Sequence, residues 1–508
     1  MASLFARKPI ADLVPDDGTG TGLRRTLGTI DLVALSIGAV IGAGIFSSIG
    51  TAAAGQMGAD GVTVVRYGAG PALVFSFILL GAVCALAALC YAELAAMIPQ
   101  AGSAYAYSYA TLGELVAWII GWDLILEYAV GNVAVAISWS GYFVSLLSGW
   151  GITIPDWLAH GYREVALAAP DSPLKHLLAD APHIAGIPVL LNVPAFAIVA
   201  LITWLLLLGV KESTEVNKVM VGVKLVVLAV FVFIGVQHID PANYHPYAPN
   251  GFKGIHQGAA IVFFAYIGFD AISTAAEETK DPQRTMPRGI MLGLLVCTLI
   301  YVAVGAVATG IVNYKQLLAN DPLAAAFNQA GLTQFTWFIS LGAVVATSAV
   351  LLVFQYGQAR IFMAMARDGL LPPWAARIHP KYRTPHLTTI AIGAFVALWS
   401  LVGDAGETYD LTNIGTLFAF MLVAIGVLVL RRIEPDRPRP FRVRFIWPVA
   451  ILAAAACVFV MLGLPPEAWV RFGVWLVVGL LLYFSYGYRR SRLRAPSAAG
   501  PPAGSPVS

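Results

Sequence analysis

Residues 36–46 read Ser36-Ile37-Gly38-Ala39-Val40-Ile41-Gly42-Ala43-Gly44-Ile45-Phe46, a glycine-rich segment inside a long apolar run. Gly42 and Gly44 each weaken a helix by about 1 kcal/mol relative to alanine. Glycine also leaves backbone N–H groups open to a ligand. We therefore predict that the helix opens at Gly42–Gly44. Its second half would begin with unpaired N–H groups and the positive end of the helix dipole, which favour a bound carboxylate. Close packing of Gly38 and Gly42 against another helix is the alternative explanation of these glycines.

A second apolar run repeats this arrangement at residues 263–271, Phe263-Phe264-Ala265-Tyr266-Ile267-Gly268-Phe269-Asp270-Ala271. Gly268 is followed two residues later by an acid in the middle of the run. A break here leaves the carbonyl groups of Phe264, Ala265 and Ile267 without helical partners, and a ligand ammonium group would satisfy them. Interrupted helices at matching places in two halves of a chain indicate a binding site at the membrane midplane. A carboxylate on one break and an ammonium on the other describe an α-amino acid.

The composition requires lipid as the solvent. Of the 508 residues, 58% are hydrophobic and only 12% are charged, whereas soluble proteins carry roughly a quarter charged residues. The four cysteines fall in apolar runs, where they act as small hydrophobic side chains. The sequence shows no nucleic-acid motif, no zinc-ligand spacing and no cofactor motif. We expect a membrane protein that works in the lipid bilayer without a metal or a cofactor.

Twelve segments are long and apolar enough to cross a bilayer, which takes about 20 mostly apolar residues. They predict an all-α polytopic membrane protein with twelve transmembrane helices. The predicted spans are residues 28–52, 71–96, 113–148, 191–210, 217–237, 255–279, 288–312, 335–366, 386–402, 409–431, 446–464 and 469–488. The two glycine breaks fall in the first and the sixth of these spans.

The basic residues predict the orientation of the spans, because lysine and arginine concentrate on the cytoplasmic side. With twelve spans, 24 of the 31 lysines and arginines fall on the side that carries both termini. Six fall on the other side, and Lys224 lies within a span. We therefore predict a multi-pass protein of the cell membrane, inner or plasma, with both termini in the cytoplasm.

The predicted organisation has a central transporter core and two polar ends. Residues 1–22 and 489–508 are polar or of low complexity and are predicted to be disordered in the cytoplasm. Residues 23–431 form the predicted core, with halves at about 28–237 and 255–431, and residues 432–488 contribute two peripheral helices. The longest outer loop, residues 150–190, has no function that its sequence reveals.

Several motifs along the chain resemble the amino acid–polyamine–organocation superfamily, and within it the bacterial relatives of the cationic amino acid transporters. The opening signature is the Gly38–Phe46 segment. The further segments that agree are Gly121-Trp122-Asp123-Leu124-Ile125-Leu126-Glu127-Tyr128, the run through Gly268-Phe269-Asp270 to Glu277-Glu278-Thr279, Gln358-Ala359-Arg360 leading to Ala366-Arg367-Asp368-Gly369-Leu370-Leu371-Pro372, and Ile414-Gly415-Thr416-Leu417. These motifs extend in order from about residue 30 to 430.

The resemblance implies a leucine-transporter-like fold, in which spans 1–5 and 6–10 are inverted repeats and spans 1 and 6 are broken. It also implies amino-acid uptake by alternating access. Carried over by position, the N–H groups of Ala43 and Gly44 would hold the carboxylate, next to Ile41 and Gly42. The carbonyls of Phe264, Ala265 and Ile267, next to Gly268, would hold the amino group. Relatives often place a hydroxyl residue where this chain has Ala43, so side-chain help to the carboxylate is lost here.

Lys224 is the candidate coupling residue. A charge at the bilayer centre costs about 2.5–3.5 kcal/mol on insertion scales, and Lys224 sits inside the fifth span. In sodium-coupled members of the fold a cation site lies between spans 1, 5 and 8, and proton-coupled relatives place a lysine there. The resemblance therefore implies proton symport through Lys224, since a buried lysine loads and releases protons readily. Snorkelling of Lys224 to the cytoplasmic face is the alternative.

Acidic residues in or beside the spans supply further candidates. Glu127 is expected to pair with Lys224, to line the route to the site, or to act only in structure, and Asp270 is expected to orient the unwound segment. Arg360 is a candidate for an inner gate. The acids near cytoplasmic span ends, for which gate, cap and plain solvation are all open, are Glu93, Glu277 and Glu278.

The function predicted from these features is secondary active uptake of L-amino acids by proton symport. An amino-acid exchanger and a non-transporting amino-acid sensor are the alternatives, while a channel is disfavoured because polar residues along the spans are sparse. The far wall of the pocket is expected to include Ile125, Val353 and Phe354. These apolar side chains favour neutral or broad specificity over a cationic substrate, whereas Glu127 favours the opposite.

Overall fold

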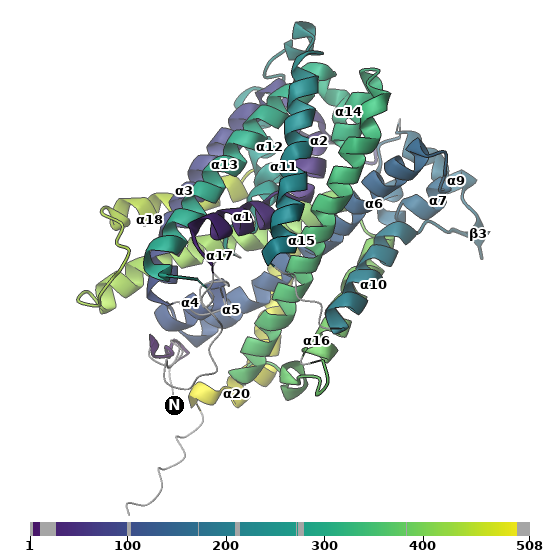
Figure 1. Ribbon diagram of the computed structural model, residues 1–508. Coiled ribbons are helices and arrows are strands. Elements are labelled where there is room, and N and C mark those ends of the chain that lie inside the picture. Colours follow the sequence, from purple (N-terminus) through teal and green to yellow (C-terminus); the bar gives the residue numbers. More distant parts are fainter. Residues whose placement is uncertain are drawn as a thin grey trace, which may run out of the picture.

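The computed structural model describes residues 4–10, 27–98, 103–170, 172–208, 214–270, 272, 279–382 and 384–494. Helices make up nearly all of its regular structure (Figure 1). Within the described residues, seven helices are long and apolar enough to cross a membrane, or eight if one bent pair counts as a single span. The chain is therefore a polytopic helical membrane protein.

The long helices follow the predicted spans closely. Each of the twelve predicted ranges overlaps a helix of the structure. The helices concerned are α1 (Thr29–Val40) with α2 (Ile49–Ala54), α3 (Leu73–Met97), α5 (Glu114–Ile125) with α6 (Gly131–Gly149), α10 (Val193–Leu207), α11 (Thr214–Val236), α12 (Gly251–Val262), α13 (Pro282–Ile311), α15 (Thr333–Arg367), α16 (His386–Val402), α17 (Ala405–Ile433), α18 (Ile446–Met461) and α19 (Pro466–Leu482).

Short elements fill the connections. The described part of the chain contains two small antiparallel hairpins, and the first pairs Gly55 with Tyr67 and Gln56 with Arg66. The short helices are α4 (Ser103–Thr111), α7 (Asp156–Ala159), α8 (Tyr162–Leu167), α9 (Leu177–Asp180), α14 (Pro322–Gln329) and α20 (Tyr488–Arg490). The strands are β1 (Gly55–Met57), β2 (Val64–Tyr67), β3 (His183–Ile184) and β4 (Ile187–Pro188). The predicted outer loop 150–190 thus carries α7, α8, α9 and the second hairpin.

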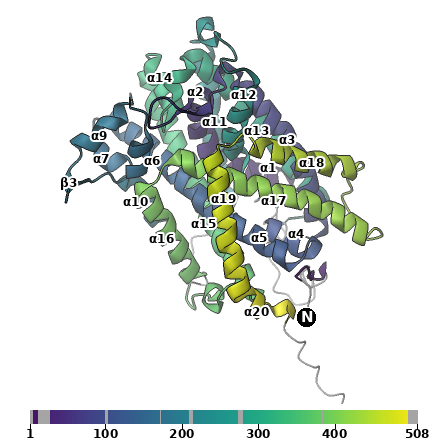
Figure 2. The same cartoon turned by 180° about the vertical axis from the view of Figure 1, so that it is seen from behind.

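The two predicted halves of the chain are interleaved. Helix α3 packs against α13, α6 against α15, and α10 against α16. Helix α1 also lies on α11 and α13, while α12 lies on α3 and α17. Helices α18 and α19 flank α17 on one face of the molecule (Figure 2). Each helix of the first half therefore touches helices of the second half, which brings the two predicted breaks within reach of each other.

Large apolar side chains lie on the outer surface as well as in the core. Phe233 of α11 is 73% exposed and Val470 of α19 is 67% exposed. A soluble protein rarely exposes broad apolar patches, so these helix faces fit contact with lipid. All four cysteines are free and buried, as expected for small hydrophobic side chains in the interior.

The two described ends of the chain meet at one face of the bundle, beside the start of α5 and the end of α15. Lys8 forms an ion pair with Asp368 at 2.9 Å, and Arg494 forms one with Glu114 at 3.1 Å. The backbone N–H of Glu114 also donates to the carbonyl of Ala6 at 3.0 Å. Because Glu114 is fully buried, both ends of the chain complete the packing of the same helix terminus.

These contacts fall partly inside the stretches predicted to be disordered. Residues 4–10 and 489–494 are described, and they pack against the helices. The rest of the predicted disordered ends, residues 1–3, 11–22 and 495–508, lies outside the described residues. The sequence had no apolar run at either end to indicate this docking, which depends on ion pairs and backbone hydrogen bonds.

Candidate functional site

The first predicted break is present in the structure. Helix α1 ends at Val40, and Ile41 and Gly42 form a bend before a π-helical turn at Gly44–Ser48. The two halves, Thr29–Val40 and Gly44–Ala54, are inclined by 42° to each other. The second half therefore begins at Gly44, and the N–H groups of its first turn lack partners within the helix.

The second predicted break is also present. Helix α12 ends at Val262 and continues as a 3-10 turn through Tyr266, and Ile267 is then extended. Gly268 has a φ of +108°, a conformation that side-chain-bearing residues rarely adopt. A β-carbon on Gly268 would lie 2.9 Å from the carbonyl oxygen of Ala39 in α1. Glycine is needed here both for its backbone angle and for its closeness to the first span.

The two breaks touch each other. A β-carbon on Gly44 would lie 2.2 Å from the Cα of Ala265, so the backbones of the two unwound segments are in direct contact. A β-carbon on Gly42 would lie 2.5 Å from a methyl group of Val350 in α15. Ala43, Gly44 and Ala265 are all buried. The structure thus brings together the N–H end of one broken helix and the carbonyl end of the other.

A tyrosine from α13 joins the two breaks. The hydroxyl of Tyr301 lies 2.7 Å from the carbonyl oxygen of Ala265 and 3.0 Å from that of Val40. The side chain is fully buried. The carbonyl of Ala265, which the sequence predicts to bind an ammonium group, therefore already has one hydrogen-bonding neighbour, and its second lone pair remains for a ligand.

Lys224 reaches the first span from α11. Its ammonium group donates a hydrogen bond of 2.7 Å to the carbonyl of Gly38, and the side chain is fully buried. Gly38 lies just before the point where α1 ends. Lys224 does not snorkel to a membrane face, because its charged group is held beside the bend of the first span.

Glu127 lies at a π-helical turn, Leu126–Val130, between α5 and α6. Such turns are frequent at functional sites. Its carboxyl group lies near the carboxyl group of Asp270 and near the hydroxyl of Thr416 in α17. Glu127 and Asp270 are 1% and 0% exposed. The structure therefore joins Glu127 to the segment after the second break rather than to Lys224.

Other predicted residues take varied places. Phe354 lies against Tyr128, with ring centroids 5.3 Å apart. Tyr128 follows Glu127 in the sequence. Arg360 stacks on the ring of Tyr356 at 4.0 Å. Glu93 is fully buried and binds Arg431 through both carboxylate oxygens, so it is no solvated helix end. Ile125 and Val353 are partly buried, and Glu277 and Glu278 lie outside the described residues.

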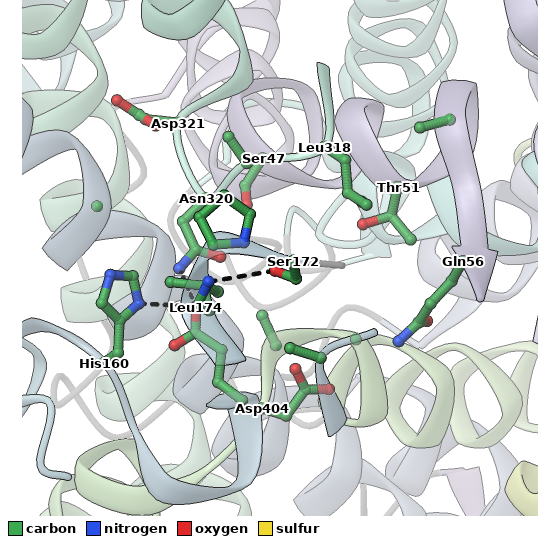
Figure 3. Close-up of a pocket in the computed structure, with 18 of the residues that line it drawn as sticks. Ser47, Thr51, Gln56, His160, Ser172, Leu174, Leu318, Asn320, Asp321 and Asp404 are labelled. Atoms are coloured by element: carbon green, nitrogen blue, oxygen red, sulfur yellow. Dashed lines mark hydrogen bonds and ion pairs between the residues drawn. The ribbon is translucent and has the colours of Figure 1, made fainter. Parts of the chain in front are cut away.

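A large cavity opens between the first hairpin and the outer loops (Figure 3). We call it the vestibule; its volume is about 1360 Å³. Ser47 and Tyr409 line it, and their hydroxyl groups are hydrogen bonded at 2.9 Å. The ring of Tyr409 packs on Phe264 at 4.7 Å. The vestibule therefore ends next to the two breaks, and Tyr409 and Phe264 separate it from them.

Ionisable groups in the vestibule have shifted pKa values. Burial raises the pKa of both Asp321 and Asp404 to about 6. Burial lowers the pKa of His160, but the carboxylates around it, chiefly Glu164 at 3.0 Å, more than offset this, so the pKa of His160 is raised. Asp321 and Asp404 both titrate in a mildly acidic range, which connects the vestibule to the pH of the solution it faces.

The family follows from a comparison of the whole sequence with known protein families. Residues 27–480 match the model of the family described as amino acid permease. The chain belongs to the amino acid permease family. This confirms the resemblance to the amino acid–polyamine–organocation superfamily. This permease is therefore a multi-pass membrane transporter and not an enzyme.

Relatives match the permease along nearly its whole length. It is 44% identical over 492 residues to the branched-chain amino acid permease BcaP of Bacillus subtilis (strain 168), covering 97% of this chain and 99% of the relative. It is 43% identical over 493 residues to the methylthioribose transporter of the same organism, covering 97% and 100%. It is 37% identical over 447 residues to the vacuolar cationic amino acid transporter 4 of Arabidopsis thaliana, covering 86% and 68%.

Several residues at the site were not predicted from the sequence. Tyr301, Val350 and Tyr409 contact the breaks from α13, α15 and α17. Tyr301 and Tyr409 are tyrosines inside long apolar helices, and a buried tyrosine hydroxyl usually needs a partner. That signal was available, although it does not say which carbonyl the hydroxyl would meet.

Proposed function

We propose that this permease takes up α-amino acids by alternating access, with the substrate bound between the two broken spans. The carboxylate would lie on the N–H groups of Ala43 and Gly44, and the ammonium on the carbonyls of Phe264, Ala265 and Ile267. The observation that carries the proposal is the contact between Gly44 and Ala265. It sets the N–H groups of one break beside the carbonyl groups of the other, and the backbone of an amino acid needs both.

The proposed architecture is twelve spans with two inverted repeats of five. In such a repeat, each of spans 1–5 has a counterpart five spans later. The packing supports this architecture, because spans that pack together have counterparts that also pack together. The pair α1 and α13 corresponds to α12 and α3, and the pair α11 and α15 corresponds to α17 and α6; all four pairs pack together. Pairs formed by counterparts, such as α3 with α13, also pack. Substrate sites of such transporters lie at the interface of the repeats.

We propose proton symport, with Lys224 as the group that loads and releases the proton. Lys224 is buried and bonded to Gly38, so a change in its charge would act directly on the first break. A lysine side chain can gain and release a proton, which an arginine does not do. Glu127 and Asp270, which face each other beside the second break, are proposed to respond to the same conformational change.

We propose a neutral aliphatic amino acid as the substrate. The residues that close over the breaks are apolar or aromatic: Val350, Phe264 and Tyr409. The relative named as a branched-chain amino acid permease supports this class. The relative named as a methylthioribose transporter is almost equally similar, so similarity along the chain does not by itself fix the substrate.

We also propose that the permease lies in the cell membrane, that the vestibule faces the outside, and that both chain ends lie in the cytoplasm. The distribution of lysine and arginine supports this orientation. The vestibule would then be the path by which substrate reaches the breaks.

Uptake into proteoliposomes tests the proposed function. Labelled leucine, valine, alanine, arginine and methylthioribose are supplied with an inward proton gradient, with a sodium gradient, or with neither. We expect leucine or valine to accumulate and the accumulation to collapse when a protonophore removes the gradient. Accumulation of arginine alone would overturn the substrate class. Uptake only against preloaded amino acid would indicate an exchanger, and binding without uptake would indicate a sensor.

A further inference from the structure

The loop between α17 and α18 is rich in arginine. Together with the adjoining helix ends, residues 431–447 contain six arginines and two acidic residues. In Figure 2 the two helices run to the same edge of the molecule, where the loop joins them. The chain therefore concentrates positive charge at one edge of the helix bundle.

A buried carboxylate holds this loop in place. Glu93, near the end of α3, binds Arg431 through both carboxylate oxygens at 2.8 Å. Glu93 also accepts a hydrogen bond of 2.9 Å from the backbone N–H of Val443. The side chain of Arg439 is 4% exposed, lies 3.6 Å from the same carboxylate, and donates to the carbonyl of Glu434 at 2.7 Å. The loop is therefore fixed to the bundle, and one carboxylate faces two guanidinium groups.

Three further arginines of this region are exposed, and none of them forms an ion pair in the described part of the chain. We call them the arginine patch: Arg432, Arg442 and Arg444. Of the two acidic residues nearby, Glu434 is paired with Arg437 at 2.7 Å. Asp436 is the other, so one carboxylate of the loop is left against three arginines.

The interior of the loop also carries an excess of positive charge. Burial lowers the pKa of Arg439, and the charges of Arg431 and Arg442 lower this pKa further, while Glu93 opposes them. Arg442 therefore lies close enough to the buried arginines to feel their charge. An anion bound at the arginine patch would relieve this repulsion.

Large apolar side chains lie directly beside the arginine patch. Phe445 is 64% exposed and Trp447 is 49% exposed, and Ile451, one turn further along α18, is 55% exposed. The guanidinium carbon of Arg444 lies 5.5 Å from the centroid of the Phe445 ring. Tryptophan is enriched where helices leave the bilayer. The exposed surface thus passes from guanidinium groups to an apolar helix face within a few residues.

We propose that the arginine patch binds an anionic phospholipid. The phosphate would lie between Arg442 and Arg444, since guanidinium groups are well suited to phosphate oxygens. The acyl chains would lie along Trp447 and Ile451. A soluble anion such as inorganic phosphate would use the arginines but leave the apolar side chains uncovered. A phospholipid uses both, so it fits this surface better.

The position of the loop indicates which leaflet supplies this lipid. Arg7, in the described N-terminal segment, lies 4.0 Å from Glu434 of the loop. The lipid would therefore lie in the leaflet on the side of the chain ends, which is the cytoplasmic leaflet in the proposed orientation. The cytoplasmic leaflet carries anionic lipids that attract basic segments beside membrane helices. The lipid site goes beyond the proposed transport of amino acids and does not depend on the substrate.

The test is native mass spectrometry of the full chain in a neutral detergent. Dioleoyl phosphatidylglycerol, dioleoyl phosphatidylcholine and inorganic phosphate are titrated separately. We expect the wild type to bind phosphatidylglycerol at least about tenfold more tightly than phosphatidylcholine. The triple variant Arg432→Gln, Arg442→Gln, Arg444→Gln is expected to lose this preference. Inorganic phosphate that binds as tightly as phosphatidylglycerol would overturn the assignment to a lipid.

A matched control separates the arginine patch from general attraction by positive charge. The triple variant Arg489→Gln, Arg490→Gln, Arg492→Gln removes the same charge from the C-terminal segment, and we expect it to keep the preference for phosphatidylglycerol. Equal loss in the two triple variants would overturn the site.

Two further measurements guard against misfolding and against failure of the transport assay. The substituted arginines are exposed, so we expect all variants to unfold at the wild-type temperature in neutral detergent. Trp447→Ser keeps every arginine, and we expect it to weaken the binding of phosphatidylglycerol; wild-type binding by this variant would overturn the acyl-chain contact. Absence of amino-acid uptake would contradict the proposed function and would leave these binding results unchanged.

Discussion

Gly44 of the first span and Ala265 of the sixth are packed backbone against backbone, so that a β-carbon on Gly44 would come within 2.2 Å of the Cα of Ala265. No side chain fits between them. The contact fixes the distance between the N–H groups of one break and the carbonyl groups of the other. Since substrate is proposed to bridge these groups, the closeness of the two backbones sets the size of the site.

Replacing Gly44 by alanine is expected to abolish high-affinity substrate binding. The added methyl group must push the two breaks apart, and overpacking of this kind costs about 1–3 kcal/mol. We expect the affinity for leucine to fall by at least tenfold in equilibrium binding. Gly222→Ala is the control, because Gly222 has no atom within 4 Å of its β-carbon position. An unchanged affinity in Gly44→Ala would contradict the carboxylate site.

Lys224→Ala is expected to lose gradient-driven accumulation and to retain exchange of internal for external substrate. Lys224→Arg should behave in the same way, because arginine keeps the charge but does not release its proton. Uptake with and without a proton gradient, compared with counterflow, separates the two activities. Normal accumulation by Lys224→Arg would show that the residue supplies a fixed charge and carries no proton.

Tyr301→Phe is expected to weaken substrate binding while leaving the fold nearly intact. The hydroxyl links the carbonyls of Val40 and Ala265, so its loss frees both breaks to move. A hydrogen bond contributes about 1 kcal/mol to stability, and we expect roughly a fivefold loss of affinity. Tyr244→Phe, which removes a hydrogen bond to Ala306, is the control. Equal effects in the two variants would show that Tyr301 stabilises the fold without organising the site.

Breaking the pair of Arg66 and Asp410 is expected to destabilise the protein strongly. Both side chains are buried, and removal of one partner of a buried pair costs about 3–5 kcal/mol. Arg66→Met and Asp410→Leu should each lower the thermal unfolding temperature by more than the double variant does. Arg163→Ala, which breaks a half-exposed pair with Glu407, should have a small effect. A double variant as unstable as the sum of the single variants would contradict the pairing.

The vestibule acids are expected to make the permease more stable at pH 5 than at pH 7. The folded-state pKa values of Asp321 and Asp404 are about 6, above the usual value near 4 for aspartate. Between these values the folded state holds protons that the unfolded state has released, so stability falls as the pH rises from about 4 to 6. Asp321→Asn should flatten this dependence in thermal unfolding measured across the range. A steady rise in stability with pH would contradict it.

Glycine spacing was enough to predict both breaks, because glycine acts through the local backbone. The contact of Gly44 with Ala265 could only be expected in outline, since the residues are far apart in sequence. Lys224 was recognised from its burial cost, yet its partner proved to be the carbonyl of Gly38 and not Glu127. A carbonyl partner has no signature in the sequence, because every residue carries one.

The vestibule could not be predicted from the sequence. Arg66 entered the prediction only as one of few basic residues on its side of the membrane, and its partner Asp410 lies 344 positions away. The one available signal was the scarcity of basic residues on that side, where Arg66 is one of six.

The docking of both described chain ends on one helix terminus also bears on biosynthesis. Glu114 is fully buried and forms an ion pair with Arg494 at 3.1 Å, and Arg494 leaves the ribosome hundreds of residues after Glu114. During synthesis the ion pair at the start of α5 therefore forms late, because one of its partners is made much later than the other. The contacts at this face are complete only after α18 and α19 have been synthesised, which makes their formation a late step in assembly.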